Sequence, residues 1–252
     1  MLVVTSSPWK LAALPGLALA ALVLTVPTAE AAAEDGAPRR LEVPGEADGF
    51  YVPPRGGKGK RTVLVWLHGR GGNPEADCRK WAQVTTEFGW LLCPAGPENR
   101  GGGARGWNNE WPGAKKTVDA TMQAFLAKHK KRAKEKGNIL IGFSEGAFVG
   151  MNIAVREPDV YSRWMILAAN DVYWGMDGSE ELKKNKKQIR RVYLLTGEKD
   201  MVVEPTRRVG KQLKDQGVRV MLSTPDDIGH EVPSDRMKQL YRRPLLWLTS
   251  AK

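Results

Sequence analysis

The chain has 252 residues, of which 42% are hydrophobic and 27% are charged. These shares are ordinary for a globular protein, and the length suits one large domain or two small ones. The formal net charge of +11 predicts a basic surface that attracts anionic partners. Much of this charge falls in two runs, residues 128–136 and 183–191, which lack interleaved aromatic residues. We interpret both runs as solvated helix ends and expect no nucleic-acid binding.

The first 33 residues are typical of a secretory signal peptide. Lys10 supplies a positive charge, residues 11–26 an apolar core, and residues 29–31 or 31–33 a small-x-small cleavage site. An apolar core of this length is too short for a bilayer, which takes about 20 residues. We therefore expect an exported protein, secreted or periplasmic, with no membrane span after signal removal. A polar linker, residues 34–40, would lead into a single catalytic domain, residues 41–252.

The segments that follow alternate between strand and helix patterns. Residues 41–53 predict one or two strands, and residues 62–67 predict an apolar strand buried on both faces. Residues 74–88 predict a helix, and residues 90–93 a short strand. The next stretch, residues 94–113, carries no regular pattern, and an irregular stretch this long is typical of a functional loop.

The second half continues the alternation. We expect helices over residues 117–134, 147–154, 205–216 and 234–248, the last capped by Ser234, and strands over residues 139–141, 163–169, 191–196 and 218–222. This order predicts an α/β fold with a mostly parallel sheet and helices on both faces. In such a sheet, ligands bind at the carboxyl ends of the strands.

Two cysteines, Cys78 and Cys93, can pair if the protein is exported to an oxidising compartment. Cys78 falls in a predicted helix and Cys93 at the end of the next predicted strand, so they are neighbours in the topology. The alternative is two separate buried thiols, and the sequence leaves both open. No other Cys or His has ligand spacing, so we expect no metal site.

A G-x-S-x-G motif at residues 142–146 stands between a predicted strand and a predicted helix. This is the sequence of a nucleophile elbow, a sharp turn that holds the serine hydroxyl clear of the sheet. Glycines flank the serine because the strand and the helix pass too close for a Cβ. The alternative is an ordinary turn with an exposed serine. We take Ser144 as the candidate nucleophile.

A serine nucleophile needs a base, and the base needs a carboxylate to fix its tautomer. The chain has three histidines. His129 lies in a lysine-rich helix end and is expected to be solvated, and His68 lies in a glycine-rich loop and is expected to be structural. The remaining histidine, His230, follows the last predicted strand and is the candidate base.

The carboxylate expected beside this base is Asp200, which follows the strand between Ser144 and His230. The order Ser, Asp, His along the chain is that of hydrolases with a nucleophile elbow. Asp171, one strand earlier, is the rival acid. Asp226 and Asp227 lie too near His230 in the same loop to be preferred.

The glycine-rich loop of residues 68–73 follows the first buried strand. In this layout one backbone N–H from such a loop joins the N–H after the nucleophile to form an oxyanion hole. This predicts Arg70 and Glu145 as backbone donors, with Gly71 as the alternative to Arg70.

Three tryptophans near predicted strand ends are candidates for the wall of a substrate pocket, namely Trp107, Trp111 and Trp174. The first two lie in the irregular stretch, and the alternative that they anchor it to the core stays open.

From about Phe50 onward the chain resembles the α/β-hydrolase superfamily, and within it the phospholipase/carboxylesterase, dienelactone-hydrolase-like and polyhydroxybutyrate-depolymerase/feruloyl-esterase branch. The residues that carry the resemblance are Tyr51-Val-Pro-Pro54, Leu67-His-Gly69, Gly142-Phe-Ser-Glu-Gly146, Gly197-Glu-Lys-Asp200 and Gly229-His230. The resemblance implies hydrolysis of an ester or thioester through an acyl-enzyme on Ser144, with no metal or organic cofactor.

Two positions depart from this branch. Dienelactone hydrolases have a cysteine nucleophile where this chain has Ser144. Glu145 stands where many relatives have a small residue, glutamine or histidine, and a carboxylate beside the oxyanion could slow attack or shape specificity.

The leading hypothesis is an exported serine esterase of a small-molecule or polymer-linked ester, whose basic surface could also associate with an anionic envelope. A peptidase of the same fold and a catalytically inert binding domain are the alternatives.

Overall fold

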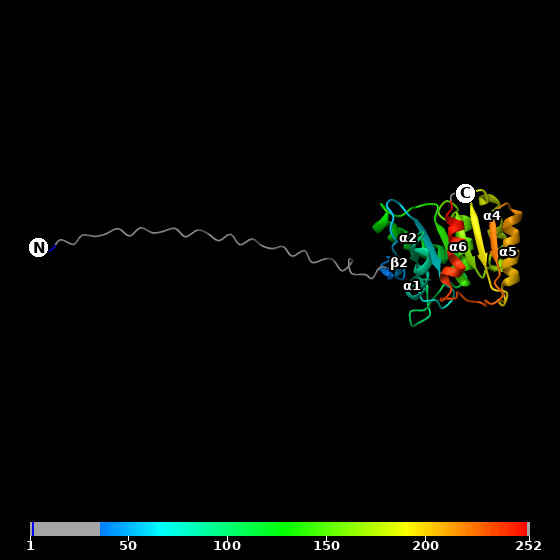
Figure 1. The fold of residues 1–252 in the computed structure, drawn as a ribbon, viewed down its shortest axis with the longest axis horizontal. Coiled ribbons are helices and arrows are strands. Elements are labelled where there is room, and N and C mark those ends of the chain that lie inside the picture. The colour runs from blue at the N-terminus through cyan, green and yellow to red at the C-terminus, as the bar shows by residue number, and fades with distance from the viewer. Residues whose placement is uncertain (1, 3–35, 251–252) are drawn as a thin grey trace. The chain divides into compact units, whose positions relative to one another are not determined.

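Short apolar runs form an eight-stranded sheet in the computed structural model, which describes residue 2 and residues 36–250 (Figure 1). The strands are β1 (Arg39–Leu41), β2 (Gly49–Val52), β3 (Thr62–Leu67), β4 (Gly89–Cys93), β7 (Ile139–Phe143), β8 (Arg163–Leu167), β9 (Arg191–Leu195) and β10 (Val220–Ser223). They lie in the order β1-β2-β4-β3-β7-β8-β9-β10. β2 pairs antiparallel with β1 and with β4, and every other pair is parallel. The predicted mostly parallel sheet is confirmed.

Helices cover both faces of this sheet. One face carries α1 (Pro74–Thr85) and α6 (Met237–Thr249), and the other carries α2 (Trp111–His129), α3 (Glu145–Arg156), α4 (Gly175–Asn185) and α5 (Val203–Asp215). Figure 1 shows α6 crossing the sheet, with α4 and α5 at the end far from β2. The helices therefore leave the ends of the strands, and the loops that follow them, as the places where polar groups can gather.

Alternate side chains of a strand serve the two cores. In β3, Val63, Val65 and Leu67 pack on the side of α2 and α3, whereas Leu64 and Trp66 pack on the side of α1 and α6. β3 is thus buried on both faces, as its continuous apolar run predicts.

The stretch expected to be irregular contains more structure than the sequence pattern indicates. It holds a two-stranded hairpin, β5 (Glu98–Asn99) with β6 (Arg105–Gly106), and α2 begins at Trp111 rather than at residue 117. The reason lies in the cap: the Glu110 side chain accepts a hydrogen bond from the Gly113 N–H at 2.8 Å, and a proline occupies the first turn.

One further helix prediction is wrong in detail, and one helix was not predicted. The last helix begins at Met237 after Arg236 and has no side-chain cap, so Ser234 does not cap it. Helix α4 has no counterpart among the predicted elements, and its last turn carries the start of the basic run 183–191. That run then continues through a turn into the first residue of β9, so only its beginning is a helix end.

The predicted signal peptide, residues 1–33, lies outside the described residues except for residue 2, and the first two residues of the expected linker lie outside them too. Strand β1 already includes Arg39 and Arg40, so regular structure begins inside that linker. Across residues 36–250, the structure contains no helix long and apolar enough to cross a membrane.

The two cysteines are bonded to each other in the structure. Cys78 of α1 and Cys93 of β4 form a disulfide with their Cα atoms 5.8 Å apart, and both side chains are fully buried. The disulfide links α1 to β4, which lies against this helix. It joins two residues that are 15 positions apart in the chain and so restricts the unfolded chain.

Candidate active site

Three loops bring Ser144, Asp200 and His230 together at the carboxyl ends of β7, β9 and β10. The His230 Nε2 lies 2.8 Å from the Ser144 Oγ. The His230 Nδ1 lies 2.9 Å and 3.0 Å from the two carboxylate oxygens of Asp200. One imidazole thus bridges a hydroxyl and a carboxylate, which is the geometry that proton transfer from a serine requires.

The backbone of Ser144 has a conformation that L-residues rarely adopt, with φ 53° and ψ −120°. A non-glycine residue held there is strained, and such strain persists only where the surroundings impose it. The flanking glycines explain how: a Cβ on Gly146 would lie 2.2 Å from the Leu67 carbonyl oxygen, and one on Gly142 would lie 2.4 Å from the Gly146 oxygen. The close approach of α3 to β3 and β7 therefore sets the turn that presents the hydroxyl.

Asp200 is only 3% exposed, and its carboxylate is fixed from two further directions. It accepts hydrogen bonds from the Thr196 hydroxyl at 3.0 Å and from the Val202 N–H at 3.1 Å. These bonds hold the carboxylate in the orientation that meets His230 Nδ1.

The rival acid is engaged elsewhere. Asp171 accepts two hydrogen bonds from the Arg208 guanidinium, at 2.6 Å and 2.9 Å, and these bonds hold the pKa of Asp171 below its usual value. Asp227 pairs with Arg236 in the same manner. The structure therefore brings Asp200, and neither of these carboxylates, to His230.

His68 is fully buried beneath the glycine-rich loop. Its Nε2 accepts a hydrogen bond from the Gly96 N–H at 3.1 Å, which leaves the proton on Nδ1, 2.8 Å from the Gly69 carbonyl oxygen. Burial lowers the pKa of His68, so the ring is neutral and positions the loop. This contact pattern agrees with the structural role expected of it.

The two backbone groups expected to face an oxyanion are available. Within the described part of the chain the Arg70 N–H donates to no acceptor, and the Glu145 N–H lies in the first turn of α3, where helical N–H groups lack intrahelical partners. The alternative donor is not available: the Gly71 N–H donates to the Arg105 carbonyl oxygen at 2.8 Å.

The side chain of Glu145 has a role that sequence reasoning missed. It is 2% exposed and pairs with Arg70, whose Nε and NH2 lie 3.1 Å and 3.0 Å from Oε1. The same carboxylate accepts the backbone N–H groups of Trp107 at 2.8 Å and Asn109 at 3.2 Å. Glu145 directly follows the nucleophile in the chain. Its side chain therefore holds the loop of the candidate oxyanion hole and the loop after β6 against the start of α3. Its position in the motif was the only signal for this.

The tryptophans expected to line a pocket are anchors. Trp107 is 1% exposed, and its Nε1 donates to the His68 carbonyl oxygen at 2.9 Å. Trp174 is 2% exposed and belongs to the core beside Trp164, while Trp111 is half-buried under the Arg156 guanidinium, 4.0 Å from the ring centroid. Burial of these large rings stabilises the loops, so the expectation that they form a pocket wall is wrong for Trp107 and Trp174.

The expectation that His129 is solvated is also wrong. Its ring lies 4.6 to 5.0 Å from the rings of Tyr51, Trp90 and Phe125 and is half-buried among them. The end of α2 packs against β2 and β4. The sequence does not indicate this contact, because lysines surround the histidine.

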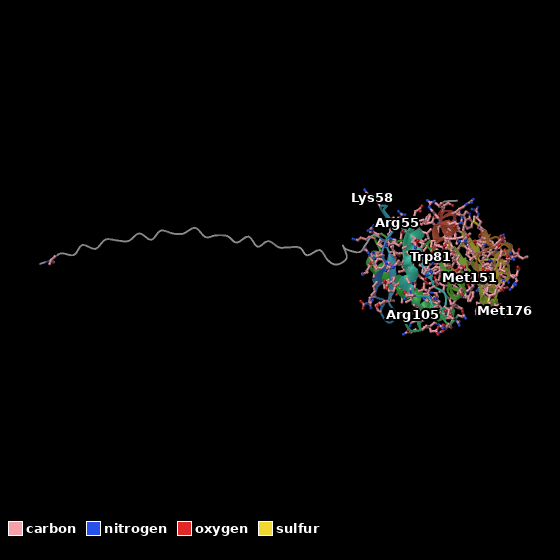
Figure 2. The ribbon with its side chains drawn as sticks, turned by 60° about the horizontal axis from the view of Figure 1, so that its bottom comes forward. Arg55, Lys58, Trp81, Arg105, Met151 and Met176 are labelled. Carbon is pink, nitrogen blue, oxygen red and sulfur yellow. A yellow bond between two sulfur atoms is a disulfide. The ribbon has the colours of Figure 1, made fainter. Side chains whose placement is uncertain are left out.

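Exposed apolar side chains occur in the segments that follow β8 and β9, including the first turn of α4, and β8 is a neighbour of the strand that leads to Ser144. Val172 is 74% exposed, Tyr173 40%, Met176 85% and Met201 90%. Figure 2 shows Met176 at the outer margin of the domain. Tyr173 stacks on Phe148 of α3 with ring centroids 4.3 Å apart. These residues, absent from the predicted site, give this edge an apolar surface.

Among the described residues, no group of three or more His, Cys, Asp or Glu side chains is placed to hold a metal ion.

Comparisons with known proteins identify the family and the fold. Residues 49–209 match the protein-family model described as "Putative esterase". Solved structures with the same fold include an esterase from Pseudomonas putida (14% identity, TM-score 0.59, covering 84% of this chain and 80% of the other) and a carboxylesterase from Bacillus cereus (15% identity, TM-score 0.56, covering 79% and 92%). A third is SOBER1 from Arabidopsis thaliana (18% identity, TM-score 0.59, covering 75% and 100%). A search of curated protein sequences finds no match. The predicted α/β-hydrolase fold is confirmed.

Proposed function

Because the chain belongs to the esterase family, and is thus a hydrolase of the carboxylesterase type, we propose that it cleaves a carboxylic ester through an acyl-enzyme on Ser144. The observation that supports this best is the 2.8 Å contact between the Ser144 Oγ and His230 Nε2, with Asp200 bonded to the other ring nitrogen. A thioester presents the same acyl carbon and belongs to the same proposal.

In the first half-reaction, His230 Nε2 takes the proton from the Ser144 hydroxyl as the oxygen attacks the acyl carbon of the ester. Asp200 accepts a hydrogen bond from the Nδ1–H and stabilises the imidazolium that forms. The carbonyl oxygen gains negative charge and is met by the Arg70 and Glu145 N–H groups. The intermediate then expels the alcohol, which receives the proton from His230.

In the second half-reaction, a water molecule attacks the acyl carbon while its proton passes to His230 Nε2. The tetrahedral intermediate releases the carboxylic acid as the Ser144 oxygen regains the proton. Each step moves one proton between His230 and a reacting oxygen, so the residues return to their starting state and no further reactant besides water is consumed.

The apolar surface of Val172, Tyr173, Met176 and Met201 supports an ester with an apolar acyl or polymer-linked portion. Apolar side chains exposed by 40 to 90% are typical of surfaces that bind an apolar ligand or partner. The leader pattern of residues 1–33 supports export to the periplasm or the medium, and the net charge of +11 supports association with an anionic envelope there.

The test is covalent labelling of the purified protein with a fluorophosphonate, followed by turnover of p-nitrophenyl esters from acetate to octanoate. Ser144→Ala should lose the label and reduce kcat/KM by about 10⁴-fold or more. Ser234→Ala removes an exposed hydroxyl outside the candidate triad, and it should behave like wild type. A p-nitroanilide series run in parallel measures amide cleavage.

Failure of the wild type to label and to turn over any ester would overturn the proposal and favour a domain that binds without turnover. Faster cleavage of the anilides than of the esters would favour a peptidase instead.

A further inference from the structure

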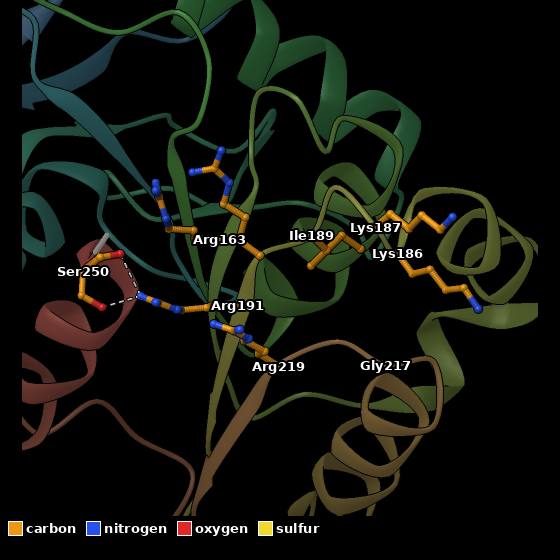
Figure 3. Close-up of a pocket in the computed structure, with 9 residues that line it drawn as sticks. Arg163, Lys186, Lys187, Ile189, Arg191, Gly217, Arg219 and Ser250 are labelled. Carbon is orange, nitrogen blue, oxygen red and sulfur yellow. Dashed lines mark hydrogen bonds between the residues drawn. The ribbon is translucent and has the colours of Figure 1, made fainter. Parts of the chain in front are cut away.

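An open cavity of about 480 Å³ lies at the amino ends of the strands, on the edge of the sheet opposite Ser144. Arg163 and Arg191 are the first residues of β8 and β9, and Arg219 directly precedes β10. Figure 3 shows the side chains of these arginines and of the lysines before β9 around the cavity. Six of its nine lining residues are basic, namely Arg163, Lys186, Lys187, Arg190, Arg191 and Arg219.

A second open cavity, of about 540 Å³, adjoins the first and shares Arg163, Lys187 and Arg190 with it. Lys134 and Lys136 add two more positive charges to its lining. Because three basic residues belong to both cavities, the two form one continuous basic groove along the amino edge of the sheet.

The positive charge of this groove is not balanced by the protein. The first cavity has no acidic lining residue, and the second has only Asp159, which is bonded to Lys136 at 2.9 Å. In the part of the chain that the structure describes, none of the six basic residues of the first cavity forms an ion pair with a carboxylate. Clustered like charges oppose folding unless an anion neutralises them.

Two of the arginines are built into the fold rather than spread over solvent. Arg191 is 4% exposed, and its NH1 donates to the Ser250 carbonyl oxygen at 3.0 Å at the end of α6. Arg163 is half-buried and donates to the Gly137 carbonyl oxygen at 2.8 Å. Burial, and then the repulsion of neighbouring arginines, lowers the pKa of both. The groove therefore has a fixed floor of positive charge with exposed cations at its rim.

We propose that this basic groove binds a polyvalent phosphate, with successive phosphate groups seated in the two adjoining cavities. Guanidinium groups bind phosphate oxygens through paired hydrogen bonds, and a chain of phosphates presents several negative charges in a row. A single phosphate can occupy one of the two cavities, whereas a linear chain of phosphates can place groups in both at once. This site does not depend on the proposed esterase function. It would be the part of the basic surface that binds the phosphate groups of an anionic envelope.

The test uses inorganic phosphate and tripolyphosphate as probes, with binding to the full protein measured by isothermal titration calorimetry at low ionic strength. Tripolyphosphate should bind saturably and at least about tenfold more tightly than inorganic phosphate, because several contacts form at once. Citrate, a tricarboxylate, should bind more weakly than tripolyphosphate.

A charge-matched pair of variants separates the groove from the overall charge. Lys187→Gln/Arg190→Gln/Arg219→Gln removes three exposed cations of the groove, and Lys58→Gln/Lys128→Gln/Lys131→Gln removes three exposed cations outside it. The groove variant should lose at least about tenfold in affinity for tripolyphosphate, and the outside variant less than about twofold. Neither variant should have a lower thermal unfolding midpoint than the wild type, and both should keep its ester turnover.

Three results would overturn the proposal: no saturable binding by the wild type, equal losses in the two triple variants, or tighter binding of citrate than of tripolyphosphate. Tighter binding of a single-stranded oligonucleotide of equal charge would also overturn it and would redirect the groove to nucleic acid.

Discussion

The two edges of the sheet use charge in opposite ways. At the carboxyl edge, Asp200 and Glu145 are 3% and 2% exposed, and each carboxylate is held by several donors. At the amino edge, Lys187, Arg190 and Arg219 are exposed, and none of the three forms an ion pair with a carboxylate of the described residues. Charges at the first edge are fixed in direction, whereas these exposed charges at the second are free to adapt.

This difference follows from what each edge can do chemically. Proton transfer at Ser144 requires an imidazole held in one tautomer and one orientation, so every group behind it must be satisfied. Attraction of a polyvalent anion requires only a concentration of positive charge, and mobile side chains provide it. Substitutions should therefore cost most at the carboxyl edge, and the cost should fall as the substituted group becomes less buried and less closely bonded.

The largest effect is expected for Asp200→Asn. The asparagine amide can donate to His230 Nδ1 and so favours the wrong tautomer, which should lower kcat/KM for p-nitrophenyl acetate by about 10⁴-fold. Circular dichroism and the unfolding midpoint should show that the variant remains folded. A loss smaller than about tenfold would mean that another carboxylate supports His230.

The next effect is expected for Glu145→Ala, which leaves the N–H groups of Trp107 and Asn109 without their acceptor and Arg70 without its partner. Each unsatisfied buried donor costs about 1–3 kcal/mol, so the free energy of unfolding should fall by about 2–4 kcal/mol. Activity should fall by about 10- to 100-fold, because the loop that carries the Arg70 N–H is no longer held.

Glu145→Gln is the matched variant, because it keeps one carbonyl oxygen to accept an N–H while removing the charge. It should recover more than half of the lost stability. If both variants had the unfolding free energy and the kcat/KM of the wild type, the carboxylate would not position the loop.

The carboxyl edge was predictable from the sequence where the chain itself dictates position. Ser144, Asp200 and His230 each follow a strand, and parallel strands end at one edge, so the order of elements alone places them together. The glycines at residues 142 and 146 predicted the close approach of strand and helix that fixes the turn.

Contacts between distant loops could not be predicted in this way. The Trp107 ring is buried because its indole N–H reaches the His68 carbonyl oxygen, 39 residues away. His129 is half-buried because the end of α2 packs on strands that come earlier in the chain. The basic groove was equally hidden, because the sequence shows two separate basic runs, whereas the fold brings them together with Arg163 and Arg219.

A smaller effect is expected from the buried ring of His68. Burial lowers its pKa below the ordinary value of 6.5, so below pH 6.5 the unfolded chain binds a proton that the folded protein does not. The stabilising contribution is therefore complete above pH 6.5 and declines as the pH falls from there toward the folded pKa.

Urea unfolding at pH 7.5 and 5.5 measures this decline. The loss of unfolding free energy between these two values should be up to about 1 kcal/mol smaller in His68→Gln than in wild type. The same loss in both proteins would show that His68 does not titrate differently in the folded and unfolded states, whatever the stability of the variant at pH 7.5.

The smallest effect is expected for Asp171→Asn, which tests whether a less buried carboxylate at the carboxyl edge matters less than the buried Asp200. Asp171 lies at the same edge as Asp200, but its partner Arg208 is 55% exposed, and an ion pair open to water contributes about 0–1 kcal/mol. The variant should keep kcat/KM within about twofold and lose less than about 1 kcal/mol of unfolding free energy. Asp200→Asn, assayed beside it, is the matched carboxylate that should fail. A large loss of activity in Asp171→Asn would mean that position along the edge, rather than burial and bonding to His230, decides which carboxylate the reaction uses.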